Sequence, residues 1–312
     1  MFNTNFSLDE IKGLPLLNFE AETVVVYNGV VQDRLSTMGF NGILNIDEKN
    51  YSGKPIHFIV VSDEEKDDYS IFMLNIFSNI KVKLITTYIS LGKSTIKSKV
   101  ALNISNGAEL YHSHYFNLES EATLERIVDV NIQENAHYKT DAFLKNEGNF
   151  KCSFSVNIVG ENSDFILKGF YSAIDKSETG IFAKINHLAS NTFSDILLKG
   201  VVEDESQVFC DMSSSAGKDL KGLDINQYHK VMLLSDQARV KSKPGMQVFA
   251  EDVEANHGLT IADLDEKEIF FLKNRGIPYS DAEEMLKDAF ANEIFNSVEN
   301  EKLREELIKN IL

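Results

Sequence analysis

The side chains that could hold iron or another metal are few and scattered along this sequence. Its two cysteines, Cys152 and Cys210, lie in no CxxC or zinc-type spacing. Because iron–sulfur clusters are normally held by cysteine thiolates, a complete four-thiolate site within one chain is excluded. Cys210 alternates with Val208 and Met212, which predicts an inward-facing core residue, with a ligand role as the alternative. Cys152 begins a similar alternating run and is also expected in the core.

His112 and His114 form the most suggestive local pair. Residues i and i+2 of a strand project from the same face, so two histidines at this spacing can grip one metal ion. No third ligand is identifiable, and an exposed polar strand face explains the pair equally well. The two histidines are therefore weaker metal candidates.

The sequence offers no arrangement typical of an enzyme. No Ser/His/Asp set or paired carboxylates stand out, and Glu251 with Asp252 is interpreted as a solvated strand end. The phosphate loop GxxxxGK[ST] is absent, so any ATP hydrolysis must come from a partner. We expect a protein that is not itself a catalyst and carries no tightly bound cofactor.

The amino-acid composition limits which classes of partner and which cellular compartment are expected. With 48 acidic and 31 basic residues the formal charge is −17, which disfavours nucleic acid and anionic membrane surfaces as partners. No apolar run approaches the roughly 18 residues of a membrane helix, and no signal peptide is recognisable. We expect a cytoplasmic protein without a membrane partner.

These residues must be positioned by β structure over most of the chain. Apolar residues alternate in short runs, such as Val100, Leu102 and Ile104, and turn clusters separate them, as at 105–107 and 146–149. No exact repeat is found. The pattern alone suits a sandwich, a barrel or a β-helix about equally.

From Asp265 onward the period becomes helical. Asp265 with Glu268 forms a capping box, and Gly276 followed by Pro278 ends the first helix. Ser280 with Glu283 predicts a second capping box, and an apolar stripe at helical spacing follows. This stripe is suited to packing on the β body, on a partner, or on both.

The stretch 244–278 resembles the C-terminal signature of the SufB/SufD proteins of iron–sulfur cluster assembly. The matching residues are Ala250-Glu251-Asp252-Val253, His257-Gly258-Leu259-Thr260, Leu264-Asp265-Glu266, Phe270-Phe271-Leu272 and Arg275-Gly276-Ile277. The similarity continues upstream through Lys199-Gly200-Val201 and Leu233-Leu234-Ser235-Asp236. It implies a mainly β protein with a right-handed parallel β-helix over 21–260 and a C-terminal helical domain over 261–312. Residues 1–20 are interpreted from the sequence itself as an N-terminal extension.

The resemblance also implies partners. In this family the helical domain docks a SufC-type ABC ATPase, and the β-helices of two SufB/SufD-type subunits pair. The positions that match the ATPase-binding region are Phe270, Phe271, Leu272, Arg275, Gly276, Ile277, Met285 and Phe290. A transient iron–sulfur cluster or iron ion would then lie at a subunit interface.

Three residues are candidates for that interface site: His257, His229 and Cys210. Histidine followed by glycine at 257–258 is the SufD-like pattern, and His229 stands where SufB-like scaffolds carry a cysteine. His257 is interpreted as part of an Asn-His-Gly bend, with a purely structural junction role as the alternative. The leading hypothesis is a SufD-like platform subunit. The alternatives are a homodimeric SufB-like scaffold and a β-helix binding module unrelated to cluster assembly.

Overall fold

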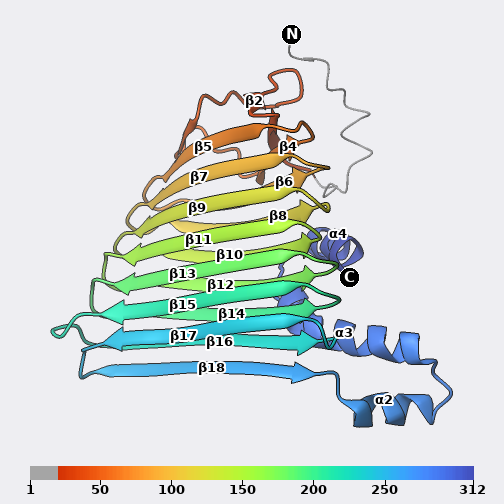
Figure 1. Cartoon of the computed structure of the whole chain (residues 1–312). Helices are drawn as coiled ribbons and strands as arrows, with labels where there is room; N and C mark the ends of the chain where they lie inside the picture. The colour runs from red at the N-terminus through yellow and green to blue at the C-terminus, as the bar shows by residue number, and fades with distance from the viewer. Residues whose placement is uncertain (1–19) are drawn as a thin grey trace.

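The structure is a computed structural model and describes residues 20–312, so the extension expected over 1–20 falls almost entirely outside the described part. Successive strands alternate between two sheets that face each other (Figure 1). The first sheet holds β1 (Glu22–Tyr27), β2 (Val30–Val31), β4 (Ile56–Ser62), β6 (Lys81–Ser90), β8 (Glu109–Leu118), β10 (His137–Asn146), β12 (Asp164–Ala173), β14 (Phe193–Val202), β16 (Leu223–Leu233) and β18 (Val253–Asp263). The second holds β3 (Ile43–Ile46), β5 (Asp67–Ile76), β7 (Thr95–Ile104), β9 (Thr123–Ile132), β11 (Asn149–Ile158), β13 (Glu178–His187), β15 (Gln207–Ala216) and β17 (Arg239–Val248).

Pairing within both sheets is parallel, apart from the short β1–β2 hairpin. A chain that visits two parallel sheets in strict alternation is a solenoid, and the parallel β-helix implied by the family resemblance is therefore confirmed. Sandwich and barrel architectures are excluded.

The rungs are built from ten-residue strands whose buried and exposed residues alternate, as in β11 and β15. The turn clusters at 105–107 and 146–149 separate these strands as predicted, with Gly107 at a φ of 68°. Inward-facing residues of both sheets form one continuous apolar core.

An asparagine ladder reveals the repeat that sequence analysis did not find. The side-chain amide of each asparagine donates to the asparagine one rung earlier, with separations of 26 to 30 residues along the chain. The ladder runs through Asn45, Asn75, Asn103, Asn131, Asn157 and Asn186. Each amide thus satisfies its neighbour and fixes the register between rungs.

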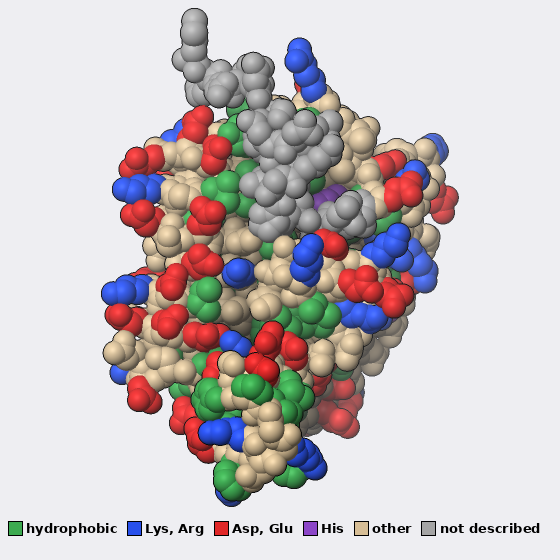
Figure 2. Space-filling model, turned by 90° about the vertical axis from the view of Figure 1, so that its right-hand side faces the viewer, with side chains coloured by type: hydrophobic (Ala, Val, Ile, Leu, Met, Phe, Trp, Pro, Cys, Tyr) green, Lys and Arg blue, Asp and Glu red, His purple; other side chains and the backbone are tan. Residues whose placement is uncertain are grey.

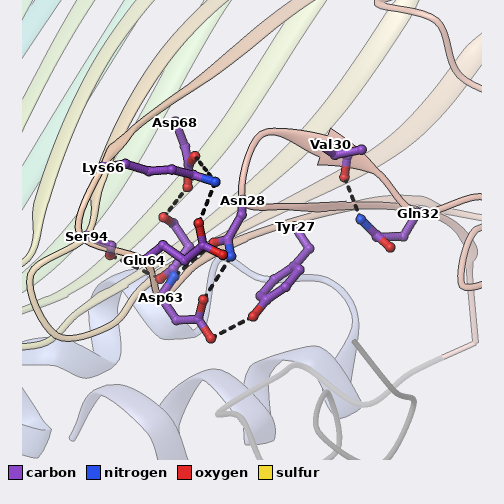
Figure 3. Close-up of polar contacts among 10 residues, drawn as sticks. Tyr27, Asn28, Val30, Gln32, Asp63, Glu64, Lys66, Asp68 and Ser94 are labelled. Carbon is purple, nitrogen blue, oxygen red and sulfur yellow. Dashed lines mark hydrogen bonds and ion pairs between the residues drawn. The ribbon is translucent and has the colours of Figure 1, made fainter. Parts of the chain in front are cut away.

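The N-terminal end of the solenoid is covered by the β1–β2 hairpin. Figure 3 shows how it is tied to the turn after β4: the Tyr27 hydroxyl donates to Asp63 over 2.7 Å, and the Asn28 side-chain amide donates to Asp63 over 2.9 Å. Below the hairpin, the rings of Phe40, Phe58 and Phe72 pack together with centroids 5.1 to 5.4 Å apart. The hairpin and the three rings thus pack over the first rungs of the solenoid.

Three helices follow the solenoid: α2 (Glu266–Lys273), α3 (Tyr279–Phe295) and α4 (Glu301–Ile311). The end of α3 and the whole of α4 pack on the outer face of the first sheet, where Phe295 stacks on Phe143 with ring centroids 5.0 Å apart. The buried Lys199 of β14 fixes α3: its Nζ donates to the Phe290 carbonyl over 2.9 Å and pairs with Glu293 at 2.6 Å. The helical stripe thus packs on the β body, as expected.

The predicted start and stop of the first helix are confirmed. Asp265 is the N-cap and accepts from the Lys267 backbone N–H over 2.8 Å, and Gly276 has a φ of 85°. The second capping box is wrong, because α3 begins at Tyr279, directly after Pro278, and the Ser280 hydroxyl donates to Asp281 instead. Within the described residues, no helix combines the length and apolar character needed to cross a membrane.

Candidate functional site

His229 lies inside the solenoid rather than at its surface. Its side chain is fully buried, and its two ring nitrogens are already used: Nε2 is 2.8 Å from the Tyr171 hydroxyl and Nδ1 is 2.9 Å from the Ser242 hydroxyl. Burial lowers the pKa of the imidazole to about 4, so the ring is neutral at physiological pH. In this arrangement His229 of β16 joins β12, on the far side of β14 in the same sheet, to β17 of the facing sheet, and has no free nitrogen for a metal.

Cys210 occupies the same layer of the core. It is fully buried, as its alternation with Val208 and Met212 predicted, and it pairs in register with Ser242 of β17. Burial raises the pKa of the thiol to about 12, which keeps it protonated and a poor ligand at neutral pH. Cys152 is also buried, and burial raises the pKa of its thiol as well.

His112 and His114 do project from one face of β8, with ring centroids 3.7 Å apart. The face is the interior one, since the two residues are only 2% and 1% exposed, so the alternative of an exposed polar strand face is wrong. Burial lowers the pKa of both rings well below the ordinary value, which keeps them neutral. Across residues 20–312, no three His, Cys, Asp or Glu side chains are placed to hold one metal ion.

His257 is the exposed member of the candidate set. It lies in the middle of strand β18, so the predicted Asn-His-Gly bend is wrong. It pairs in register with Gln227 of β16, whose side chain is fully buried, so both residues belong to the row that faces the solenoid interior. His257 is exposed only because β18 is the last strand of its sheet.

The C-terminal end of the solenoid is open. Strands β17 and β18 are the terminal strands of the two sheets, and Figure 1 shows no element beyond them among the described residues. Three large apolar side chains are exposed there: Leu259 at 40%, Ile261 at 39% and Phe249 at 70%. Unpaired strand edges beside exposed apolar residues are a ready surface for pairing with another chain.

A second exposed apolar surface lies on the helices. Of the residues in α2 only Ile269 is buried, while Phe270 is 66% exposed and Phe271 is 54% exposed. The Arg275 guanidinium lies 3.8 Å from the centre of the Phe271 ring, which stiffens this exposed ring. In Figure 2 hydrophobic side chains gather at the lower end of the molecule, where α2 and the start of α3 project.

The predicted ATPase-binding residues divide into two groups in the structure. Exposed on the projecting helices or their connection are Phe270, Phe271, Arg275, Gly276 and Met285, whereas Leu272, Ile277 and Phe290 are half-buried. The Lys199 ammonium lies over the Phe290 ring, 4.7 Å from the centre of the ring. This contact helps to fix α3 to the solenoid. Sequence reasoning missed Tyr279, which is 47% exposed and adds to the same surface.

Lys199 and Gly200 also gain a physical role that sequence reasoning did not assign. Lys199 holds α3, as described above, and a Cβ at position 200 would lie 1.9 Å from the Tyr171 ring. The run Lys199-Gly200-Val201 was noticed only as part of the resemblance. A glycine directly after a lysine within an otherwise apolar strand is the signal that could have indicated a close approach there.

The protein is thus a parallel β-solenoid with an exposed strand edge at its C-terminal end and a projecting helical arm. The family model described as "SUF system FeS cluster assembly, SufBD core domain" matches residues 59–290, and the chain belongs to this family. It is similar to the iron–sulfur cluster assembly protein SufD of Escherichia coli, with 25% identity over 224 residues, which is 69% of this chain and 51% of that protein.

One further relative is also a SufD protein, and another is named only as a member of the SufBD family. SufD of Plasmodium berghei is 26% identical over 229 residues, covering 69% of this chain and 17% of that protein. A SufBD family protein of Synechocystis is 40% identical over 72 residues, covering 23% of this chain and 16% of that protein. The chain thus spans about half the length of the E. coli relative and a smaller part of the other two.

Proposed function

We propose that this chain is a non-catalytic platform subunit of a SUF-type iron–sulfur cluster assembly complex, working in the cytoplasm. It binds a SufC-type ABC ATPase through its helical arm and a second SufB/SufD-type subunit through the open end of its solenoid. The observation that carries the proposal is the exposed aromatic surface of α2, at the positions where the sequence resemblance implies an ATPase partner.

The helical arm has the properties of a docking surface. Phe270, Phe271 and Tyr279 expose roughly half or more of their surface, although a monomer gains nothing from leaving three aromatic rings in water. The arm is nevertheless held firmly at its base, because Lys199 and Glu293 fix α3 to the solenoid. A rigid arm with aromatic residues at its tip can transmit movement of a bound ATPase to the β-helix.

The open end suits a second subunit. A partner that adds strands to β17 and β18 would satisfy their unpaired backbone groups and cover Leu259 and Ile261. It would also enclose His257 against the buried Gln227. His257 is therefore the one histidine of the candidate set that a subunit interface could use, and a transient iron or cluster held there would be cargo of the complex.

The interior residues argue against a scaffold built on this chain alone. Cys210 is a buried protonated thiol, and both ring nitrogens of His229 are already hydrogen-bonded. The runner-up, a homodimeric scaffold that uses these residues from two chains, would require both to leave the core. Anaerobic reconstitution with iron and sulfide separates the two hypotheses: a stable visible chromophore on the isolated protein supports the scaffold, and its absence supports the platform.

The direct test is binding of an ABC-type ATPase from the same host. The two purified chains are mixed without oxygen, with and without ATP, and analysed by size-exclusion chromatography with light scattering. The proposal predicts a complex that contains both chains. If the ATPase elutes alone under all conditions, the remaining alternative is a β-helix binding module unrelated to cluster assembly.

A further inference from the structure

The outer face of the second sheet carries a local excess of positive charge near the C-terminal end of the solenoid. Helices α3 and α4 pack on the first sheet, so within residues 20–312 the helices leave this face uncovered (Figure 1). On β11, β13, β15 and β17 the charged side chains that face outward are five basic and two acidic ones: Lys151, Lys184, Arg239, Lys241 and Lys243, with Glu178 and Asp211. The whole chain, by contrast, has a formal net charge of −17.

Two half-buried aromatic rings lie among these charges. The ring centroids of Phe182 and Phe209 are 5.5 Å apart. The Lys151 Nζ lies 5.9 Å from the centre of the Phe182 ring, and the Nζ atoms of Lys241 and Lys243 lie 5.9 and 5.6 Å from that of Phe209. These contacts orient the lysine side chains, but an aromatic ring has no net charge and leaves theirs uncompensated.

No carboxylate of the chain compensates these charges either. Within the described part of the chain, none of the five basic side chains takes part in an ion pair, whereas Lys97, near the other end of the same sheet, pairs with Asp67. The Arg239 guanidinium donates to the backbone carbonyls of Asp236 and Ala238. The positive charge on this face is therefore available to a partner.

The basic surface has a limited extent. On β9, the next strand toward the N-terminal end, the charged residues that face outward are Glu125 and Asp129, so the positive region begins at β11. From β11 to β17 there are three strand spacings, or about 14 Å. An extended peptide advances about 3.3 Å per residue, so about four or five residues cross this distance. A longer polyanion, such as nucleic acid, would extend onto the acidic side chains of β9.

We propose that the surface formed by Lys151, Phe182, Phe209, Lys241 and Lys243 binds a short acidic peptide segment of a partner protein. Carboxylates of the segment pair with the lysine ammonium groups, and an apolar side chain between them packs on the two phenylalanine rings. Charge complementarity selects this class of partner, because the lysines have no countercharge within the described residues and the region is only a few residues wide. The proposal does not rest on the proposed function, since side chains that stand on the face of a sheet are separate from the strand edges and from the helical arm.

The test selects the segment without assuming its sequence. Random short peptides displayed on phage are selected on the immobilised full chain, and the enriched peptides are synthesised with a fluorescein label. Their Kd for the chain is then measured by fluorescence anisotropy at low and at high salt. We expect the enriched sequences to place acidic residues around an apolar or aromatic one, and we expect their affinity to fall as salt is added.

Two variants show whether binding occurs at the proposed surface. Lys241→Glu combined with Lys243→Glu reverses two exposed charges beside Phe209 and should raise the Kd by about 10-fold or more. Lys99→Glu is the matched control, because Lys99 is exposed on the same face of the sheet but lies on β7, outside the surface. The control should bind the peptide as the wild-type chain does, and thermal melting verifies that both variants fold.

The same anisotropy assay is repeated with a labelled single-stranded oligonucleotide, and binding to phosphatidylserine vesicles is measured by co-sedimentation. The proposal is overturned if acidic peptides are not enriched, or if the double variant binds them as tightly as the wild-type chain. An equal loss with Lys99→Glu would contradict it too, since the effect would then come from the total charge. Tighter binding of the oligonucleotide or the vesicles, lost in the double variant, would assign the surface to that other class of partner.

Discussion

Replacing Phe271 with glutamate perturbs the proposed ATPase surface most specifically. The ring is 54% exposed, and α2 touches the rest of the chain mainly through the buried Ile269. Because the change adds a charge at a largely exposed position, we expect the free energy of unfolding to change by no more than about 0.5 kcal/mol. The folded chain should therefore be preserved, which makes binding the informative quantity.

The expected loss of binding follows from the chemistry of the site. An aromatic anchor at the centre of a protein interface typically contributes about 2 kcal/mol or more, which corresponds to roughly 30-fold in Kd. Burying a carboxylate in the same contact adds to that loss, and removing the ring also frees the Arg275 guanidinium that packs on it at 3.8 Å. We therefore expect Phe271→Glu to weaken ATPase binding by about 30-fold or more.

Isothermal titration calorimetry with the purified ATPase measures this change, and Ile127→Glu is the matched control. Ile127 is 50% exposed and lies on β9, in the sheet that the helices do not cover. The control variant should bind as the wild-type chain does. A Phe271→Glu chain with unchanged melting temperature and a Kd within about threefold of the wild-type value would refute the assignment of the arm.

Three further predictions concern the solenoid. Leu259→Glu at the open end should abolish the complex with the second SufB/SufD-type subunit in light-scattering measurements, whereas Thr260→Glu on the opposite face of the same strand should not. A complex that survives the Leu259 change would exclude this end as the interface. Gly200→Ala places a Cβ 1.9 Å from the Tyr171 ring and should lower the free energy of unfolding, measured by urea denaturation, by about 1–3 kcal/mol. Gly217→Ala is the control, because a Cβ there meets no atom within 4 Å, and it should leave the free energy of unfolding unchanged. Burial raises the pKa of Asp141 to about 6, so its protonated form stabilises the fold at low pH and that stability is lost as the pH rises through 6. The free energy of unfolding of Asp141→Asn should then exceed that of the wild type by about 1–3 kcal/mol above pH 6. This difference should vanish toward pH 4. A difference that does not change with pH would show that the carboxyl group is not buried.

The sequence predicted β structure well but could not distinguish among three β architectures. Alternation such as Val100, Leu102 and Ile104 reports which face is buried, and the same alternation occurs in sandwiches, barrels and solenoids. The distinguishing feature is the asparagine ladder, whose spacing varies between 26 and 30 residues. An inexact repeat of one polar residue is hard to recognise until the strands are stacked.

The helix ends illustrate where local rules succeed and where they fail. Asp265 caps α2 as predicted, because an aspartate N-cap needs only its own backbone neighbourhood. Ser280 does not cap α3, since the N-cap is Pro278, two residues earlier, and Ser280 already lies inside the first turn. At His257 a turn-like Asn-His-Gly sequence is drawn into a strand by pairing with β16, which is a tertiary effect invisible to local reasoning.

The histidines show the same limit at the candidate site. The spacing of His112 and His114 correctly placed them on one face, but it could not say whether that face was inside or outside. Likewise, His229 and Cys210 carry metal-binding chemistry in sequence, while hydrogen bonds to Tyr171 and Ser242 hold the histidine in the core. Arg126 lies two residues before Val128 on the same alternating row of β9, so the period of two alone places its side chain in the interior.

The most direct test of the platform assignment is an anaerobic affinity purification of the tagged chain from its own host, with every co-purifying chain identified by mass spectrometry. The account predicts recovery of an ABC-type ATPase together with a second SufB/SufD-type subunit, and loss of the ATPase alone from the Phe271→Glu sample. Recovery of neither partner with the folded wild-type chain would contradict it.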